Sequence, residues 1–214
     1  GRVELIMSAV DKVLSLIPSP FEDVRKLEYR DFEKMYEGFS YRFFKTPHLA
    51  GFLSGIGNLI RKHGSAGSCF KKYYDYEGSL IPAVHSFSRE LLAGCEKSPG
   101  ILVTESWKGS AFKRFNLFLR WMARSDNIDP GGWDFINKEE LIVPLDTHMM
   151  NIGKYIGLTG RATPSLKTAI EITENLKKYD KMDPVRFDFS LTRLGIHPDL
   201  TIEKLKLLEG RENE

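Results

Sequence analysis

The sequence of 214 residues predicts an all-α protein whose helices form two lobes. Apolar residues recur at the 3.6-residue helical period along most of the chain, and proline or glycine ends most of these periodic segments. No segment alternates apolar and polar residues between hairpin turns, as half-buried strands do. We therefore expect about seven to nine helices.

The composition is that of an ordinary soluble globular protein, with 42% hydrophobic and 28% charged residues. The formal net charge of +2 neither requires nor excludes nucleic acid, so the placement of the basic residues decides that question. No apolar run approaches the roughly 20 residues of a membrane span, and no signal peptide is recognisable. The pattern is already helical at Gly1, so we expect an N-terminal piece to be missing.

Only two cysteines occur, Cys69 and Cys95, which are too few for a disulfide framework or for an iron–sulfur cluster held by four cysteines. This usage fits a reducing cytoplasm, which is the expected location. The five histidines are scattered and none pairs at ligand spacing, so we expect no zinc site. We expect neither a metal nor another cofactor.

In the N-terminal half, the helical period covers residues 3–17, 29–37, 47–63 and 81–95. Pro18-Ser19-Pro20 ends the first of these helices, and Gly64 ends the third. Residues 69–78, CFKKYYDYEG, fit no period clearly; they suit contact with nucleic acid, or a loop whose tyrosines pack on the core. SGIGN, residues 54–58, lies inside an apolar helix with no strand before it, so it is not a nucleotide-binding loop.

In the C-terminal half, we expect helices over residues 111–124, 147–157, 163–178 and 183–195. The last two begin at Thr163-Pro164 and Asp183-Pro184, where a capping residue precedes a proline at the first helical position. The expected division is an N-terminal lobe over residues 1–99, a second lobe over 100–184, and C-terminal helices over 185–214 that pack back on the first lobe.

The segment KGSAFKRFNLFLRWMAR, residues 108–124, predicts an amphipathic helix with one polar face, formed by Lys113, Asn116, Arg120 and Arg124. Composition alone favours a solvated face. Gly109-Ser110 precedes the helix, so backbone N–H groups at its N-terminus can bind a phosphate. The positive end of the helix dipole disfavours an ammonium ion at Lys113, and a neutral amine is what a Schiff-base nucleophile needs.

In the segment LIVPLDTHMMNIGKYIGL, residues 141–158, an apolar stretch that we expect to be buried leads directly to the carboxylate of Asp146. Aspartate is among the best helix caps, typically worth about 1 kcal/mol, so Asp146 has a structural role available to it. It can also do chemistry, and a residue can cap a helix and face a site at once. We expect His148 to be a packed or exposed helix residue rather than a ligand.

GSAFKRFNLFL followed by VPLDTH resembles the helix-hairpin-helix-GPD superfamily of base-excision DNA glycosylases, the endonuclease III and 8-oxoguanine glycosylase group. In that group a Gly-x-Gly-x-Lys hairpin opens a helix, and a Val-Asp-Thr-His segment follows. Gly109 stands at the first hairpin glycine, Lys113 at the lysine of the lyase-type enzymes, and Asp146 at the catalytic aspartate. Residues 112–195 more closely resemble an uncharacterised bacterial family placed in that superfamily, through FLRWMAR, PLDTH and KTAIEITENLKK.

The resemblance implies a two-lobed glycosylase-like fold with a degenerate hairpin, and a DNA glycosylase or glycosylase/AP lyase of base-excision repair. Lys113 would be the nucleophile and Asp146 the activating carboxylate. The partner would be double-stranded DNA with a damaged base or an abasic site, bound by a monomer. The DNA contacts implied are Gly109, Ser110, Ala111, Arg114 and Arg120.

The sequence departs from the superfamily pattern at the second hairpin glycine, which is Ala111 here and would be strained wherever glycine used a positive φ. The gap between the lysine and the aspartate is also longer and holds the insert SDNIDPGGWDFINKEEL. Two alternatives therefore stay open: a DNA-binding member without catalysis, or an enzyme acting on a small nucleoside-like ligand. The second predicts that Lys108, Arg114, Arg120 and Arg124 form no continuous basic surface.

Overall fold

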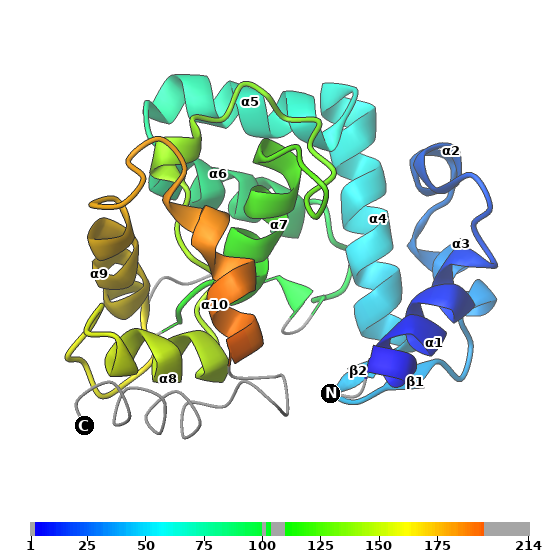
Figure 1. Cartoon of the computed structure of the whole chain (residues 1–214). Coiled ribbons are helices and arrows are strands. Elements are labelled where there is room, and N and C mark those ends of the chain that lie inside the picture. Colours follow the sequence, from blue (N-terminus) through cyan, green and yellow to red (C-terminus); the bar gives the residue numbers. More distant parts are fainter. Residues whose placement is uncertain (1–2, 100–101, 104–109, 195–214) are drawn as a thin grey trace, which may run out of the picture. The chain divides into compact units, whose positions relative to one another are not determined.

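The computed structural model describes residues 3–99, 102–103 and 110–194 (Figure 1). The chain divides into two compact units, residues 1–105 and 106–214. Ten α-helices and one two-stranded antiparallel sheet make up the regular structure of the described residues, together with short 3₁₀ turns. The prediction of a mostly helical protein is therefore confirmed.

The first unit contains six helices and the hairpin. They are α1 (Val3–Leu14), α2 (Pro20–Lys26), α3 (Tyr29–Met35), β1 (Ser40–Tyr41), β2 (Phe44–Lys45), α4 (Thr46–His63), α5 (Ala66–Glu77) and α6 (Leu80–Ala93). The second unit contains α7 (Lys113–Ala123), η2 (Lys138–Glu140), α8 (Thr147–Tyr155), α9 (Leu166–Leu176), η3 (Pro184–Phe187) and α10 (Asp188–Leu194).

Helix α4 is the centre of the first unit and contacts α2, α3, α5 and α6 (Figure 1). Three of its glycines make this close packing possible. A Cβ added at Gly51 would overlap the carbonyl oxygen of Lys97, one at Gly55 would overlap Sγ of Cys95, and one at Gly57 would overlap the carbonyl oxygen of Val24. The glycines of SGIGN therefore serve helix packing, which agrees with excluding a nucleotide-binding loop there.

Sequence patterns missed two helices of this unit. The first helix ends at Leu14, before Pro18-Ser19-Pro20 and earlier than the expected end at residue 17, and Ser19 is the N-cap residue and Pro20 the first residue of α2. The aromatic stretch that fitted no period lies in α5, which buries Cys69 and Phe70. A two-residue turn also joins β1 to β2, which the absence of an alternating pattern did not predict.

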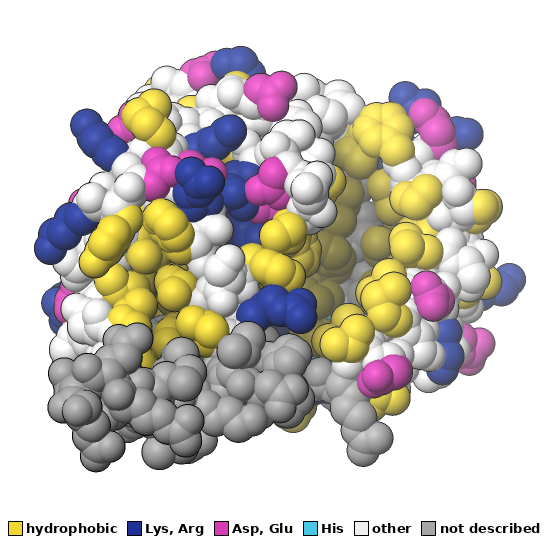
Figure 2. All heavy atoms as spheres, in the orientation of Figure 1, with side chains coloured by type: hydrophobic (Ala, Val, Ile, Leu, Met, Phe, Trp, Pro, Cys, Tyr) yellow, Lys and Arg dark blue, Asp and Glu magenta, His cyan; other side chains and the backbone are white. Residues whose placement is uncertain are grey.

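Helix α1 has the predicted amphipathic pattern, but none of its residues is buried. Its apolar side chains include Leu5, Val10 and Leu14, which are 58%, 43% and 45% exposed, and apolar side chains of this unit are seen at the surface in Figure 2. The helix is tied to the unit by the Tyr36 hydroxyl, which donates to the carbonyl oxygen of Val13 at 2.8 Å.

In the second unit, an extended buried segment leads to the start of α8. Leu141, Val143 and Leu145 are each at most 3% exposed. The backbone N–H of Val143 donates to Thr173 Oγ1 in α9 at 3.0 Å, so the extended segment satisfies its polar backbone through a neighbouring helix. Because this segment is buried and hydrogen-bonded to α9, Asp146 has a defined position at its end.

The insert between α7 and η2 folds back on α7. The N–H groups of Gly131 and Trp133 donate to the carbonyl oxygens of Trp121 and Met122 at 2.9 and 2.8 Å. The Trp133 ring is buried and meets the Phe118 ring edge-on at 5.2 Å between centroids. The insert is thus part of the packed unit, and it brings its acidic residues to the end of α7.

Candidate active site

Lys113 and Asp146 lie 33 residues apart in sequence and contact each other directly. Lys113 is the first residue of α7, and Asp146 immediately precedes α8. The Nζ atom of Lys113 lies 3.0 Å from Oδ2 of Asp146. The lysine side chain is 46% exposed and the aspartate side chain 24%, so a ligand can approach the pair from solvent. The structure brings together the two residues that sequence motifs single out.

Asp146 uses its two oxygens differently. Oδ1 accepts from the backbone N–H of Met149 at 2.8 Å, which makes Asp146 the N-cap of α8, and Oδ2 accepts from Lys113. Burial alone would raise the pKa of Asp146, but the hydrogen bonds from Met149 and Lys113 lower it below its usual value. Asp146 is therefore a helix cap and a permanently ionised carboxylate at neutral pH.

The turn before α7 is held by local hydrogen bonds. The N–H of Phe112 donates to Ser110 Oγ at 3.2 Å, and the Asn116 side-chain amide donates to the carbonyl oxygen of Ala111 at 3.1 Å. The left-handed residue is Phe112, with φ 50° and ψ 30°, and not Ala111. A left-handed non-glycine residue costs on the order of 1–3 kcal/mol, so packing around the buried Phe112 ring must hold this conformation.

The hairpin residues implied as DNA contacts are only partly described. Gly109 and Lys108 lie outside the described residues. Ser110 and Ala111 are half-buried, and Arg114 is exposed on the first turn of α7. Phe112 is the N-cap residue of α7, and its side chain makes no capping hydrogen bond.

The remaining polar face of α7 is buried, and this differs from the solvated face that composition favours. Arg120 is 3% exposed. Its Nε donates to Asp129 Oδ2 at 3.1 Å, and its Nη1 donates to Asp188 Oδ2. We therefore assign Arg120 to an internal ion-pair cluster instead of to a DNA phosphate, because its guanidinium is enclosed and both its partners are carboxylates.

Arg124, one helical turn further, belongs to the same cluster. It is 7% exposed, and its guanidinium pairs with Asp183 at 2.9 Å, with Asp126 at 2.8 Å and with Asp129. We call the connected residues the α7 ion-pair cluster: Arg120, Arg124, Asp126, Asp129, Asp183 and Asp188. Its two cations face four carboxyl groups, so the cluster has an excess of acid.

Asp188 shows the effect of this excess. Its pKa is raised from 3.8 to about 6, mainly by burial and to a smaller extent by the charge of Asp146, while Arg120 and Lys113 oppose the increase. Its Oδ1 atom is buried and has no hydrogen-bond partner among the described residues. Sequence analysis did not select Asp188, because its partner Arg120 lies 68 residues earlier and no short motif links them.

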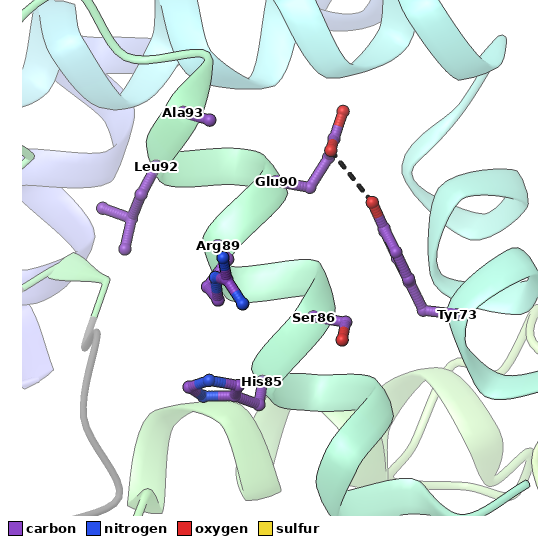
Figure 3. Close-up of a pocket in the computed structure, with 7 residues that line it drawn as sticks. All are labelled: Tyr73, His85, Ser86, Arg89, Glu90, Leu92 and Ala93. Carbon is purple, nitrogen blue, oxygen red and sulfur yellow. Dashed lines mark hydrogen bonds between the residues drawn. The ribbon is translucent and has the colours of Figure 1, made fainter. Parts of the chain in front are cut away.

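A hollow of about 840 Å³ lies beside α6 in the first unit (Figure 3). It is lined by Tyr73, His85, Ser86, Arg89, Glu90, Leu92 and Ala93. Glu90 accepts from Lys62 at 2.6 Å, from Tyr73 at 2.9 Å, and contacts His63 at 3.0 Å. The hydrogen bonds from Lys62 and His63 lower the pKa of Glu90 to about 2, so this carboxylate joins α4, α5 and α6 rather than serving as an acid or base.

The next two features concern membrane spans and metal ligands among the described residues. None of the described helices is long and apolar enough to cross a membrane. Within the same residues, no group of three or more histidine, cysteine, aspartate or glutamate side chains is arranged to hold a metal ion. The Lys113–Asp146 pair is thus the arrangement with the clearest chemistry, a primary amine beside an ionised carboxylate.

Comparison with known proteins gives one match. Residues 1–197 match the model of a family described as a protein of unknown function, DUF2400. No curated protein and no solved structure matches the chain.

Proposed function

The chain belongs to the DUF2400 family of unknown function, and we propose that it is a DNA glycosylase or glycosylase/AP lyase of base-excision repair. The observation that carries the proposal is the 3.0 Å contact between Lys113 Nζ and Asp146 Oδ2. The two residues of a motif resembling the helix-hairpin-helix-GPD glycosylases meet in space, each at the start of a helix. A chance motif match would not require that contact.

In the proposed reaction, the neutral amine of Lys113 attacks C1′ of a flipped-out nucleotide. The C1′–N bond to the base breaks, its electron pair leaves with the base, and the base takes up a proton. Lys113 is then bonded to C1′ as a secondary amine. Asp146 stabilises the positive charge that develops on the sugar, because its carboxylate is ionised and close by.

The lyase step begins from the new bond between Lys113 and C1′. The C1′–O4′ bond breaks, O4′ takes a proton, and a C=N imine forms between Lys113 and C1′. Loss of a proton from C2′ then expels the 3′ phosphate, and water releases Lys113 by hydrolysing the imine. The first attack needs an amine that has lost its proton, whereas at rest Asp146 holds Lys113 in an ion pair.

DNA contacts in this proposal come from the turn before α7. Backbone N–H groups at the N-terminus of α7, with Ser110 and Ala111, would bind a phosphate, and Gly109 would be part of the same turn. Arg114 is exposed beside Lys113 and would add a phosphate contact. Such contacts offset the few kcal/mol needed to flip a nucleotide out of the duplex.

One observation favours the second candidate, an enzyme acting on a small nucleoside-like ligand. Arg120 and Arg124 are enclosed by carboxylates and cannot extend a basic surface from the pair. In Figure 2, basic side chains lie interspersed with acidic ones on the face shown. The salt dependence of DNA binding separates the candidates, because phosphate-dominated binding weakens steeply as salt increases.

Sodium borohydride trapping tests the proposed function. Duplex oligonucleotides carrying an abasic site or 8-oxoguanine are incubated with the wild type and with Lys113→Gln, Asp146→Asn and Lys154→Gln. We expect a covalent adduct with the wild type and with Lys154→Gln, a matched lysine on α8. Lys113→Gln should give none, because borohydride reduces only an imine. An adduct that persists in Lys113→Gln, or a wild type that traps no substrate, would refute the proposal.

A further inference from the structure

We propose that Asp188 is the proton store of this site and accepts the proton that Lys113 releases before its amine attacks. The inference rests on the proposed function and adds a third residue to it. Asp188 does not touch a ligand in this role, since its side chain is only 6% exposed. It acts on the reaction through the Lys113–Asp146 pair.

The position of Asp188 supports this role. Asp188 is the first residue of α10, and α10 packs on α8, the helix that Asp146 caps. Arg120 binds one oxygen, Oδ2, and fixes the carboxyl group. The other oxygen, Oδ1, is buried without a hydrogen-bond partner in the described part of the chain. A buried ionised oxygen without a donor is unfavourable, so this oxygen is a place where a proton is stabilised.

The charged groups that act on Asp188 are Arg120 and Lys113 of α7 and Asp146 at the start of α8. Arg186 of η3 and Arg193 of α10 are the basic residues nearest to Asp188 in sequence. Arg186 is paired with Asp180, and Arg120 is shared between Asp188 and Asp129. Asp146 and Lys113 both act on Asp188 electrostatically, so the charge state of the pair and that of Asp188 depend on each other.

The surroundings of Asp146 and Asp188 shift the pKa values of these two carboxyl groups in opposite directions. Hydrogen bonds from Met149 and Lys113 outweigh burial and lower the pKa of Asp146, whereas burial raises the pKa of Asp188 to about 6. Such a separation commonly divides the roles of acid and base within a site. Asp146 remains a carboxylate throughout, and Asp188 gains or loses a proton near neutral pH.

The proton transfer can be written in full. An N–H bond of the Lys113 ammonium breaks and leaves its electron pair on nitrogen, which becomes the neutral nucleophile. The proton is taken up at Asp188 Oδ1, where an O–H bond forms, and Asp146 keeps its negative charge. When the imine is hydrolysed and Lys113 is released as an amine, Asp188 returns the proton and the ion pair with Asp146 forms again.

The first test measures the coupling without any activity. The carboxyl ¹³C resonance of Asp188 is titrated in the wild type, Asp146→Asn, Lys113→Gln and Asp183→Asn. Removing the negative charge of Asp146 should lower the titration midpoint of Asp188, and removing the positive charge of Lys113 should raise it. Asp183→Asn makes the same charge change at the Arg124 end of the cluster and should shift the midpoint less. A midpoint that responds to neither Asp146→Asn nor Lys113→Gln would overturn the proposal.

The second test measures the rate of borohydride-trapped imine formation on abasic DNA in single-turnover reactions across pH. The wild-type rate should fall as pH drops through about 6, where Asp188 becomes protonated and can no longer accept a proton. Asp188→Asn should remove this acidic limb and lower the rate at pH 7 by about 100-fold, the low end for a positioned acid–base group. Asp188→Glu should retain the limb, as should Asp183→Asn.

The outcomes separate the two proposals. If the wild type forms no adduct, the proposed function fails and the role of Asp188 fails with it. If the wild type forms the adduct and Asp188→Asn keeps the same acidic limb, the proposed function stands and the proton store is refuted. Asp188 would then be an anchor for Arg120 only. Should Asp188→Asn not fold, the titrations in Asp146→Asn and Lys113→Gln still decide the question.

Discussion

The raised pKa of Asp188 makes a prediction about folding stability that does not depend on any activity. In the unfolded chain its carboxyl should titrate near the ordinary value of 3.8, and in the folded protein near 6. The folded state therefore binds more protons than the unfolded state between these pH values. The stabilisation from Asp188 is fully present below pH 3.8 and is lost as pH rises through about 6.

The size of the effect follows from the difference between the two pKa values. Each pKa unit corresponds to about 1.4 kcal/mol, so a difference of roughly two units gives about 3 kcal/mol between the ends of the window. Asp188→Asn cannot titrate and keeps an oxygen for Arg120. The free energy of unfolding of the wild type, minus that of Asp188→Asn, should therefore fall by about 2 kcal/mol between pH 4 and pH 7, because the unfolded carboxyl is already partly ionised at pH 4.

The assay is urea unfolding of both proteins at several pH values between 4 and 7, followed by circular dichroism. Other groups titrate in both proteins, so their contributions largely cancel in the difference. A matched series with Asp183→Asn should give a much smaller change, because Asp183 is more exposed than Asp188. If the difference between wild type and Asp188→Asn does not vary with pH, the pKa of Asp188 is not raised in the folded protein and the prediction is refuted.

Three further substitutions have expected outcomes in the same unfolding assay. Arg124→Met should destabilise the protein by roughly 3–5 kcal/mol, because it leaves buried aspartates without their cation. Asp146→Ser should keep the cap of α8 and cost under about 1 kcal/mol, yet abolish borohydride trapping; retained trapping would reduce Asp146 to a cap. Gly57→Ala should cost roughly 1–3 kcal/mol or more, because its Cβ would overlap the carbonyl oxygen of Val24. Gly160→Ala, where a Cβ meets nothing within 4 Å, is its control and should be near neutral.

Sequence patterns predict the long helices of this protein well. The expected helix over residues 47–63 is α4, Thr46–His63, and the expected helix over 111–124 contains α7. Both have an apolar face long enough for the 3.6-residue period to be visible. The short α2 was missed because Ser19-Pro20 suits a helix start as well as a helix end, and α5 was missed because only Cys69 and Phe70 are buried on it.

The candidate site was predictable in part. Lys113 and Asp146 were selected through motif resemblance, and their contact agrees with a shared site. The environment of Arg120 was not predictable, because a cation on a helix face looks the same in sequence whether it meets water or carboxylates. Its partners Asp129 and Asp188 come from an insert and from a later helix, and only folding places them beside it.

The glycines of α4 also determine how the length of this helix can change. One added residue rotates everything beyond it by about 100° around the helix axis. An insertion between Gly51 and Gly57 would therefore keep one backbone approach and turn the other away, placing a side chain where the carbonyl oxygen of Lys97 or Val24 now lies. Homologous chains should accordingly vary in the length of their loops and keep this stretch of α4 free of insertions and deletions.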